Sequence, residues 1–252
     1  TNWNADHEVR VSVRDDNVSD GTQAFFVRLG ADNTTSDTSG YRGLDPQDVP
    51  VSVLDDETAG FLVSPISGSV TEEGGQGVFT VRLLGAPSSG SVLISVSSDN
   101  TSEATVSPDS LSFGASDWSS EKTVTVTGVD DNISDGNAGV VISLSLIGSP
   151  PAEYAGLNPA DVVVVNLDDE TAGFVVSPIS GNLMEPSSES TFTVKMTSAP
   201  TDSVSIPVGV GGSDEASVSP SILVFSRTNW NADHEVRVSV RDDNVSDGTQ
   251  AF

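Results

Sequence analysis

The 252-residue sequence contains no cysteine, few aromatic residues (6%), and only 10 lysines and arginines against 37 aspartates and glutamates. Without cysteine the chain forms no disulfide, thiolate nucleophile, zinc finger or iron–sulfur site. A formal charge of −27 excludes the basic surface that nucleic-acid binding requires and opposes binding to anionic membranes. No apolar run approaches the roughly 18 residues that cross a bilayer, and no signal-peptide pattern opens the sequence. We therefore expect no nucleic-acid partner and no membrane insertion.

The sequence repeats itself. Residues 1–25 recur unchanged at 228–252, and residues 54–68 return with one substitution at 167–181. The unit is therefore about 113 residues long, which is the size of one small domain. We expect residues 1–57 to be the C-terminal half of one unit, 58–170 to be a complete unit, and 171–252 to be a unit that lacks its last strand or strands. Such limits predict a piece of a longer tandem array.

Within a unit the hydrophobic pattern is that of β-strands. Apolar residues alternate with polar ones over 79–83, 92–96, 124–126 and 142–146, and clusters of Gly, Pro, Ser, Asn and Asp separate these runs. No stretch has a convincing helical period. About seven short strands in such a unit predict an all-β fold of tandem Greek-key, immunoglobulin-like antiparallel β-sandwich domains.

Comparison of the diverged copies indicates which side chains face inward. Val124 and Val126 correspond to Val236 and Val238, whereas Lys122 becomes His234. We interpret the column of Lys122 and His234 as solvent-facing, where a metal ligand or general base is not expected. Since this is the only histidine column, the units cannot share a Ser–His pair, and we expect no enzyme.

Acidic residues recur in the diverged copies at three places, whereas other surface acids do not. Residues 130–136 recur at 15–21 and 242–248, and 168–170 recur at 55–57. By contrast, Asp109 becomes Ser221 and Glu73 becomes Pro186. The recurrent carboxylates are Asp15, Asp16, Asp20, Asp55, Asp56, Glu57, Glu72, Asp130, Asp131, Asp135, Asp168, Asp169, Glu170, Glu185, Asp242, Asp243 and Asp247.

The recurrent acids lie at strand ends, so we expect them to meet at one pole of each sandwich. Two Asp pairs follow the expected strands 122–129 and 161–167, and Glu72 precedes the strand 77–84. Several carboxylates at one pole repel one another unless a cation lies between them, and oxygen ligands without His or Cys favour Ca²⁺. The alternative is that these residues only form turns, which explains Asn132, Asp135 and Gly136 but not the adjacent Asp pairs.

Together these motifs resemble the Calx-beta domain. The resemblance is carried by Glu72 and Glu185, by Thr-Val-Thr-Val-Thr-Gly-Val-Asp-Asp at 123–131, and by Asn-Leu-Asp-Asp-Glu at 166–170. It implies a seven-stranded β-sandwich that binds a Ca²⁺ cluster through the loops at one end. The family occurs as a regulatory sensor in sodium–calcium exchangers and as tandem repeats in long bacterial surface and adhesion proteins.

The resemblance also implies a ligand set for the complete unit: Glu72, Asp130, Asp131, Asp135, Asp168, Asp169 and Glu170. Members of the family often carry Glu-Gly-Asp-Glu after the first Asp pair, where this chain has Ser-Asp-Gly-Asn at 134–137. One carboxylate fewer implies fewer ions or weaker binding.

The functional expectation is a calcium-stiffened structural spacer of a long extracellular adhesin, filament or matrix fibre, located outside the cell or at its surface. Its expected partners are neighbouring copies of the repeat, in tandem or by lateral or end-to-end association, with no small-molecule substrate. Two alternatives stay open. One is a regulatory calcium-sensing module of a larger protein. The other is a calcium-dependent carbohydrate-binding sandwich, for which Tyr41 and Tyr154 are the candidate stacking residues, although both fit loop anchors better.

Overall fold

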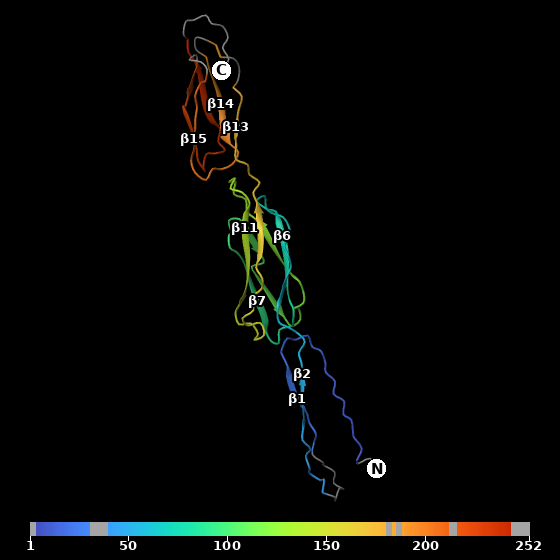
Figure 1. The fold of residues 1–252 in the computed structure, drawn as a ribbon. Helices are drawn as coiled ribbons and strands as arrows, with labels where there is room; N and C mark the ends of the chain where they lie inside the picture. The colour runs from blue at the N-terminus through green and yellow to red at the C-terminus, as the bar shows by residue number, and fades with distance from the viewer. Residues whose placement is uncertain (1–3, 31–39, 180–182, 185–187, 212–215, 243–252) are drawn as a thin grey trace.

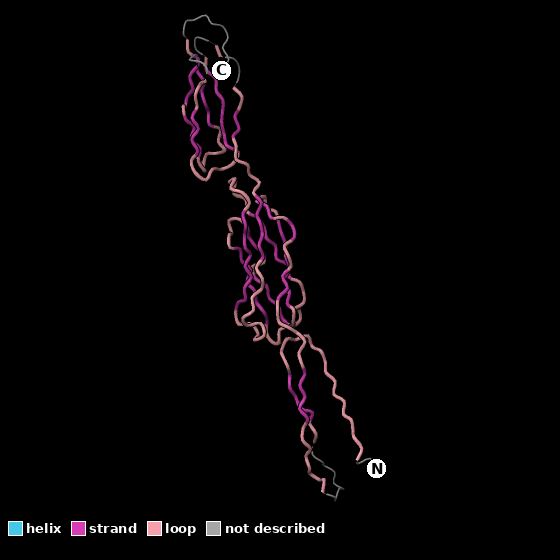
Figure 2. Tube along the Cα trace, in the orientation of Figure 1, coloured by secondary structure: helices cyan, strands magenta, loops and turns pink. Residues whose placement is uncertain are grey.

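The computed structural model describes residues 4–30, 40–179, 183–184, 188–211 and 216–242. Three units of strands lie end to end along one axis, with the N-terminal and C-terminal units at opposite ends (Figure 1). The described residues form strands, turns and loops (Figure 2). Within them there is no helix long and apolar enough to cross a membrane.

The middle unit is a sandwich of two sheets. One sheet has the order β3-β6-β10-β8, with β4 also paired to β6, and the other has the order β5-β12-β11-β7-β9. All pairs are antiparallel except β12 with β5. The strands are β3 (Phe61–Val63), β4 (Ser67–Gly68), β5 (Val70–Thr71), β6 (Gln76–Leu83), β7 (Ser91–Ser98), β8 (Ala104–Ser107), β9 (Ser110–Gly114), β10 (Lys122–Gly128), β11 (Ala138–Ile147) and β12 (Val162–Leu167). This architecture confirms the expected all-β, immunoglobulin-like fold.

The core of the middle unit follows from the alternating pattern of its strands. On β6, Phe79, Val81 and Leu83 are buried while their neighbours on the strand are more exposed. These side chains face Ile94 and Ile142 of the opposite sheet in one continuous cluster. Burial of each such side chain stabilises the fold by roughly 1.5–3 kcal/mol, so packing supplies the stability that disulfides give to other small domains.

The outer units contain complementary parts of the same sandwich. The N-terminal unit has β1 (Gln23–Val27) paired with β2 (Val49–Val53). The C-terminal unit has one sheet in the order β13-β14-β18-β16 and a β15–β17 pair. Its strands are β13 (Phe174–Val176), β14 (Glu189–Met196), β15 (Val204–Pro207), β16 (Ala216–Ser219), β17 (Ile222–Phe225) and β18 (His234–Val240). The boundaries at 57/58 and 170/171 fall between strands and stay predictions.

The sequence alignment places β1 and β2 at the positions of β11 and β12. The pair Gln23 and Val53 occupies the register position of Ala138 and Asn166, and the four following pairs match in the same way. The units therefore use one strand register, although their loops differ in length.

The prediction that Lys122 and His234 face solvent is wrong. Lys122 is half-buried, its Nζ lies 4.7 Å from the centroid of the Phe113 ring, and it forms a 2.6 Å ion pair with Asp117. His234 lies in the same way against Phe225, with ring centroids 4.4 Å apart. The reason is strand parity: position 122 shares the inward face with Val124, so a long or flat side chain there covers the end of the core.

Candidate metal centre

The ends of β10 and β12 and the start of β6 meet at one pole of the middle unit. β12 pairs with β5 through Asn166 and Leu167, and the carbonyl of Leu167 accepts a 3.1 Å hydrogen bond from the N–H of Glu72. Gly128, the last residue of β10, lies so close that an added Cβ would be 2.5 Å from Asn166 Oδ1. Any other residue at position 128 would therefore push Asn166 and the backbone of Thr71 away. Glu72, the residue after Thr71, thus lies close to the ends of both β10 and β12.

Three oxygen atoms at this pole are buried without a hydrogen-bond donor. They are Glu72 Oε2, Glu170 Oε2 and Asn166 Oδ1, and Glu72 and Asn166 are only 2% and 0% exposed. The Asn166 amide donates to Glu72 Oε1 at 3.4 Å and to Glu103 Oε2 at 3.1 Å, so its donors are used and its carbonyl oxygen is not. Buried acceptors without donors are destabilising unless a cation or water satisfies them.

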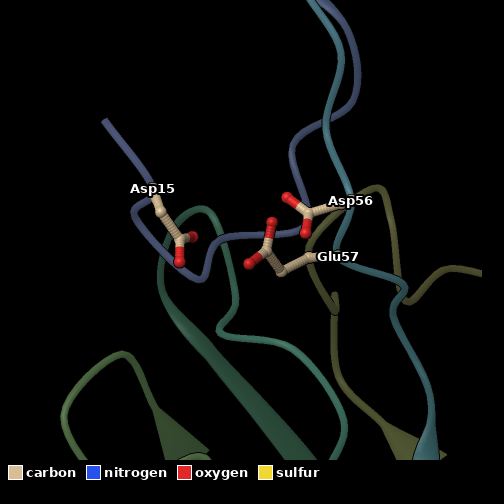
Figure 3. A group of neighbouring side chains, drawn as sticks. All are labelled: Asp15, Asp56 and Glu57. Carbon is tan, nitrogen blue, oxygen red and sulfur yellow. The ribbon is translucent and has the colours of Figure 1, made fainter. Parts of the chain in front are cut away.

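Two groups of carboxylates are close enough to bind one ion each. In the middle unit, one oxygen from each of Glu72, Asp169 and Glu170 lies within 4.8 Å of the others. In the N-terminal unit the same holds for Asp15, Asp56 and Glu57, which lie on two different segments of the chain near one another (Figure 3).

The N-terminal group borders a cavity. Its volume is about 270 Å³, and its lining includes Asp15, Asp16, Asp20, Asp55, Asp56 and Glu57. This cavity therefore contains every carboxylate that the sequence predicted for the N-terminal unit.

Burial and the crowding of the carboxylates raise the pKa of Glu72 and Glu170 in the middle unit and of Glu57 in the N-terminal unit. Burial, followed by contact with Glu170 and by the charges of Asp168 and Asp131, raises the pKa of Glu72 to about 7. The pKa of Glu57 is also raised to about 7, first by its side-chain contact with Asp55 and then by desolvation and nearby negative charges. A bound cation would reverse this effect, because it stabilises the ionised form.

The first aspartate of each Asp-Asp-Glu motif holds the loops together. The two carboxylate oxygens of Asp168 accept N–H groups of Gly136 at 2.6 Å and Glu170 at 2.8 Å. These two backbone bonds lower the pKa of Asp168, and Asp55 is bonded in the same way to Gly21 and Glu57. Asp168 therefore fixes the position of the loop residues around the carboxylates of Glu72 and Glu170.

The structure distributes the remaining predicted residues around the groups. Asp130 and Asp131 act electrostatically on the pair of Glu72 and Glu170, and Asp131 Oδ1 also accepts the N–H of Ile133 at 2.8 Å. Asp135 is exposed and belongs to neither group within the described residues. Asp242 lies just after β18. Glu185, Asp243 and Asp247 lie outside the described residues.

Sequence reasoning missed two residues of this pole, Asn166 and Glu103. Asn166 occupies an inward position of β12, whose other inward residues are valines, and a polar residue on a buried strand face is the signal that could have identified it. Glu103 lies in the turn before β8 and is recognisable only through its contact with Asn166.

The donor set fits a hard divalent cation. All candidate ligand atoms are carboxylate or amide oxygens carried by loops and strand ends. Ca²⁺ accepts six to eight oxygens in flexible geometry, whereas Mg²⁺ requires a stricter octahedron and retains more water. A calcium ion would supply the partner that the buried oxygens of Glu72, Glu170 and Asn166 lack.

The fold defines the class of the protein, an immunoglobulin-like β-sandwich module with acidic loops at one pole. The family model of the Calx-beta domain matches residues 2–57 and 55–170, and the chain belongs to this family. Calx-beta domains are non-enzymatic calcium-binding modules.

Solved structures that resemble the chain include two CBD12 structures and one MSP family member. CBD12 from CALX1.2 is 15% identical with a TM-score of 0.31, and the match covers 74% of this chain and 77% of the other. The calcium binding domain CBD12 of CALX1.1 is 15% identical with a TM-score of 0.31 and coverages of 73% and 76%. The MSP family member WR4 of C. elegans is 16% identical with a TM-score of 0.29 and coverages of 43% and 96%. No curated protein sequence matches the chain.

Proposed function

We propose that this chain is part of a calcium-stiffened spacer in a long extracellular adhesin, filament or matrix fibre. Each repeat binds Ca²⁺ at the pole that faces the next repeat, and the ion holds the two repeats in one orientation. The ligands of the middle unit are Glu72, Asp169, Glu170 and the oxygens around them, with Asp130, Asp131 and Asp168 adjacent. The N-terminal unit uses Asp15, Asp56 and Glu57 in the same way.

The observation that carries this proposal is the pair of neighbouring carboxylates of Glu72, which is buried, and Glu170, which is half-buried. Each has an oxygen without a donor, and burial, together with the charges of the surrounding aspartates, raises the pKa of both glutamates. Two such groups do not serve solubility, because solubility requires exposed charge. A cation between them satisfies their oxygens and cancels their repulsion.

The position of the site favours a mechanical role. Three residues, 171–173, separate Glu170 from β13. This linker is bonded to the following unit, since Thr197 donates from Oγ1 to the carbonyl of Thr171 at 2.5 Å and from its N–H to the carbonyl of Gly173 at 3.0 Å. An ion at Glu170 therefore acts directly on the junction.

The carbohydrate alternative has less support. Tyr154, one of its two candidate stacking residues, is fully buried and donates to the carbonyl of Gly85 at 2.5 Å. It anchors a loop and offers no ring face to a sugar. Tyr41, which is 67% exposed, occupies the equivalent position of the N-terminal unit, so the two candidate rings do not share one exposed surface.

The test is a thermal melt of the full chain in Ca²⁺, in Mg²⁺ and in chelator, together with a calcium titration. Ca²⁺ at 100 times its dissociation constant adds about 2.7 kcal/mol per site to the free energy of unfolding. We expect a calcium-specific rise that the exposed control Asp109→Asn retains and Glu170→Gln loses.

The titration separates the two calcium hypotheses. A dissociation constant of roughly 10⁻⁴–10⁻³ M supports an extracellular spacer, because such a site stays filled outside cells, whereas roughly 10⁻⁷–10⁻⁵ M supports the regulatory sensor. An unchanged melting midpoint in Ca²⁺ contradicts both and leaves the acidic segments as turns.

A further inference from the structure

The same backbone contact joins consecutive units at both junctions. Val18 forms a parallel β-bridge with Ala86, and Ile133 forms one with Ala199. In each case the alanine N–H donates to the residue before the bridge, Ala86 to the carbonyl of Asn17 at 2.9 Å and Ala199 to the carbonyl of Asn132 at 2.8 Å. The contact is thus a repeated feature of the array.

The loop that makes this contact is the one that carries the Asp pair. Asn17 and Asn132 have φ values of 58° and 65°, in the left-handed region that Asn adopts more readily than most residues. The preceding aspartate stabilises the turn, since Asp131 Oδ1 accepts the N–H of Ile133 at 2.8 Å and Asp16 Oδ1 that of Val18 at 3.0 Å. The backbone bond to the next unit therefore starts one residue after the Asp pair.

The contact is buried at its centre. Ile133 and Ala199 are each 6% exposed and Ala86 is 3% exposed. At the first junction a Cβ added to Gly85 would lie 3.2 Å from the Cβ of Ser19, so the two units approach closely there. A loop that only formed a turn would have no reason to bury an isoleucine against another domain.

We propose that this loop, residues 130–136 and its copy 15–21, is a two-sided coupling element. One side lies against the acidic group of its own unit: Asp15 belongs to that group, and the loop 130–136 is bonded to Asp168 through Gly136 and to Glu170 through Ser134. The other side docks on a short segment of the next unit that ends in a proline, Gly85–Pro87 or Ser198–Pro200. The docking surface around Ala86 or Ala199 thus binds the loop of the preceding repeat in the same array. Ion binding orders the loop, and the ordered loop fixes the orientation of the next repeat.

The coupling rests on the proposed calcium site and adds a surface to it that contributes no ion ligand. Ala199 belongs to the next unit, and its N–H bonds to a backbone carbonyl. Ile133 is apolar and buried. Substitutions at these two positions therefore separate docking from ion binding, which substitution of an acidic residue cannot do.

The test measures the distance between two units in the full chain. Since the protein has no cysteine, Ser97→Cys and Ser205→Cys, both at exposed strand positions, place spin labels on the middle and C-terminal units. Electron paramagnetic resonance then gives the distance distribution in Ca²⁺ and in chelator. We expect Ca²⁺ to narrow the distribution in the labelled parent.

Ala199→Arg places a large charged side chain under the docked loop, and Ile133→Ala removes the buried side chain from the opposite partner. We expect both variants to keep the calcium-induced rise in melting midpoint. We expect neither to show the calcium-induced narrowing of the distance distribution. Ala86→Arg is the matched control, because it changes the first junction only and should leave the narrowing between the labelled units intact.

The outcomes distinguish the two proposals. The proposed coupling element is wrong if Ca²⁺ narrows the distance distribution in both variants as it does in the parent. It is also wrong if Ca²⁺ raises the melting midpoint of the parent without narrowing its distance distribution. In both cases the calcium site stands. If the parent shows no calcium-dependent rise in midpoint, the proposed function itself fails.

Discussion

Replacement of Glu72 by glutamine should affect stability in opposite directions with and without calcium. Glu72 is 2% exposed and shares its pole with Glu170 and several aspartates. In chelator its charge is buried without a cation, so the neutral and nearly isosteric glutamine should raise the stability of the middle unit. In Ca²⁺ the substitution removes a ligand, so the stabilisation by calcium should fall.

The magnitude follows from the pKa. The pKa of Glu72 is raised from 4.5 to about 7 in the folded protein, so the fold holds this proton more tightly than the unfolded chain does. The free energy of unfolding is therefore highest below pH 4.5, where Glu72 is protonated in both states, and it falls as the pH rises to 7. At pH 8 this loss amounts to roughly 3 kcal/mol. Glutamine does not titrate and avoids it. We therefore expect Glu72→Gln to stabilise the calcium-free middle unit by up to about 3 kcal/mol, or about 10 °C in midpoint.

The assay is a thermal melt at pH 8 followed by the fluorescence of Trp118, which packs against the core of the middle unit. Replacing Trp3 and Trp230 by phenylalanine restricts the signal to that unit. Glu73→Gln is the control, since Glu73 is the exposed neighbour. A lower midpoint of Glu72→Gln in chelator, or a calcium-induced shift equal to that of the parent, would refute this reasoning.

Three further predictions concern the same pole and the opposite one. In chelator the melting midpoint of the middle unit should decrease as the pH is raised from about 5 to about 8, because the raised pKa of Glu72 makes its ionisation unfavourable in the folded state. Saturating Ca²⁺ should remove this decrease. A midpoint that does not change with pH in chelator contradicts the prediction. Asp168→Ala leaves the N–H groups of Gly136 and Glu170 without their acceptor, so calcium-free stability, measured by urea unfolding, should drop. An unchanged midpoint would show that these bonds are dispensable. Tyr154→Phe removes the buried donor to Gly85 and should destabilise the unit by about 1–3 kcal/mol with the calcium shift intact; loss of that shift would indicate long-range coupling between the poles.

Much of the fold could be predicted because strands have a two-residue period that the sequence displays directly. The alternation around Phe79 and Val124 identifies the inward face of each strand, and both residues are buried in the core. The period does not say where the core ends along a strand. Lys122 shares the parity of Val124, and only the position of Phe113 beneath it shows that this residue covers the core.

The acidic pole could be predicted in outline and not in detail. Strand ends place the Asp pairs and Glu72 together, but the path of a loop decides what each carboxylate contacts. Asp168 bonds to Gly136, 32 positions away, and Asn166 bonds to Glu103 across 63 positions. The contact of Ile133 with Ala199 depends on the relative orientation of two domains, which no pattern within one repeat specifies.

The route of the chain through each repeat has a mechanical consequence. In the middle unit β3 begins at one pole and β12 ends at the other, and both strands run along the axis of the array (Figure 1). Tension on the array therefore pulls β3 past β6 and β12 past β11, along their length. Their backbone hydrogen bonds lie across this direction, so all bonds of a strand resist shear together. A repeat built in this way should extend under load at its junctions before its strands separate.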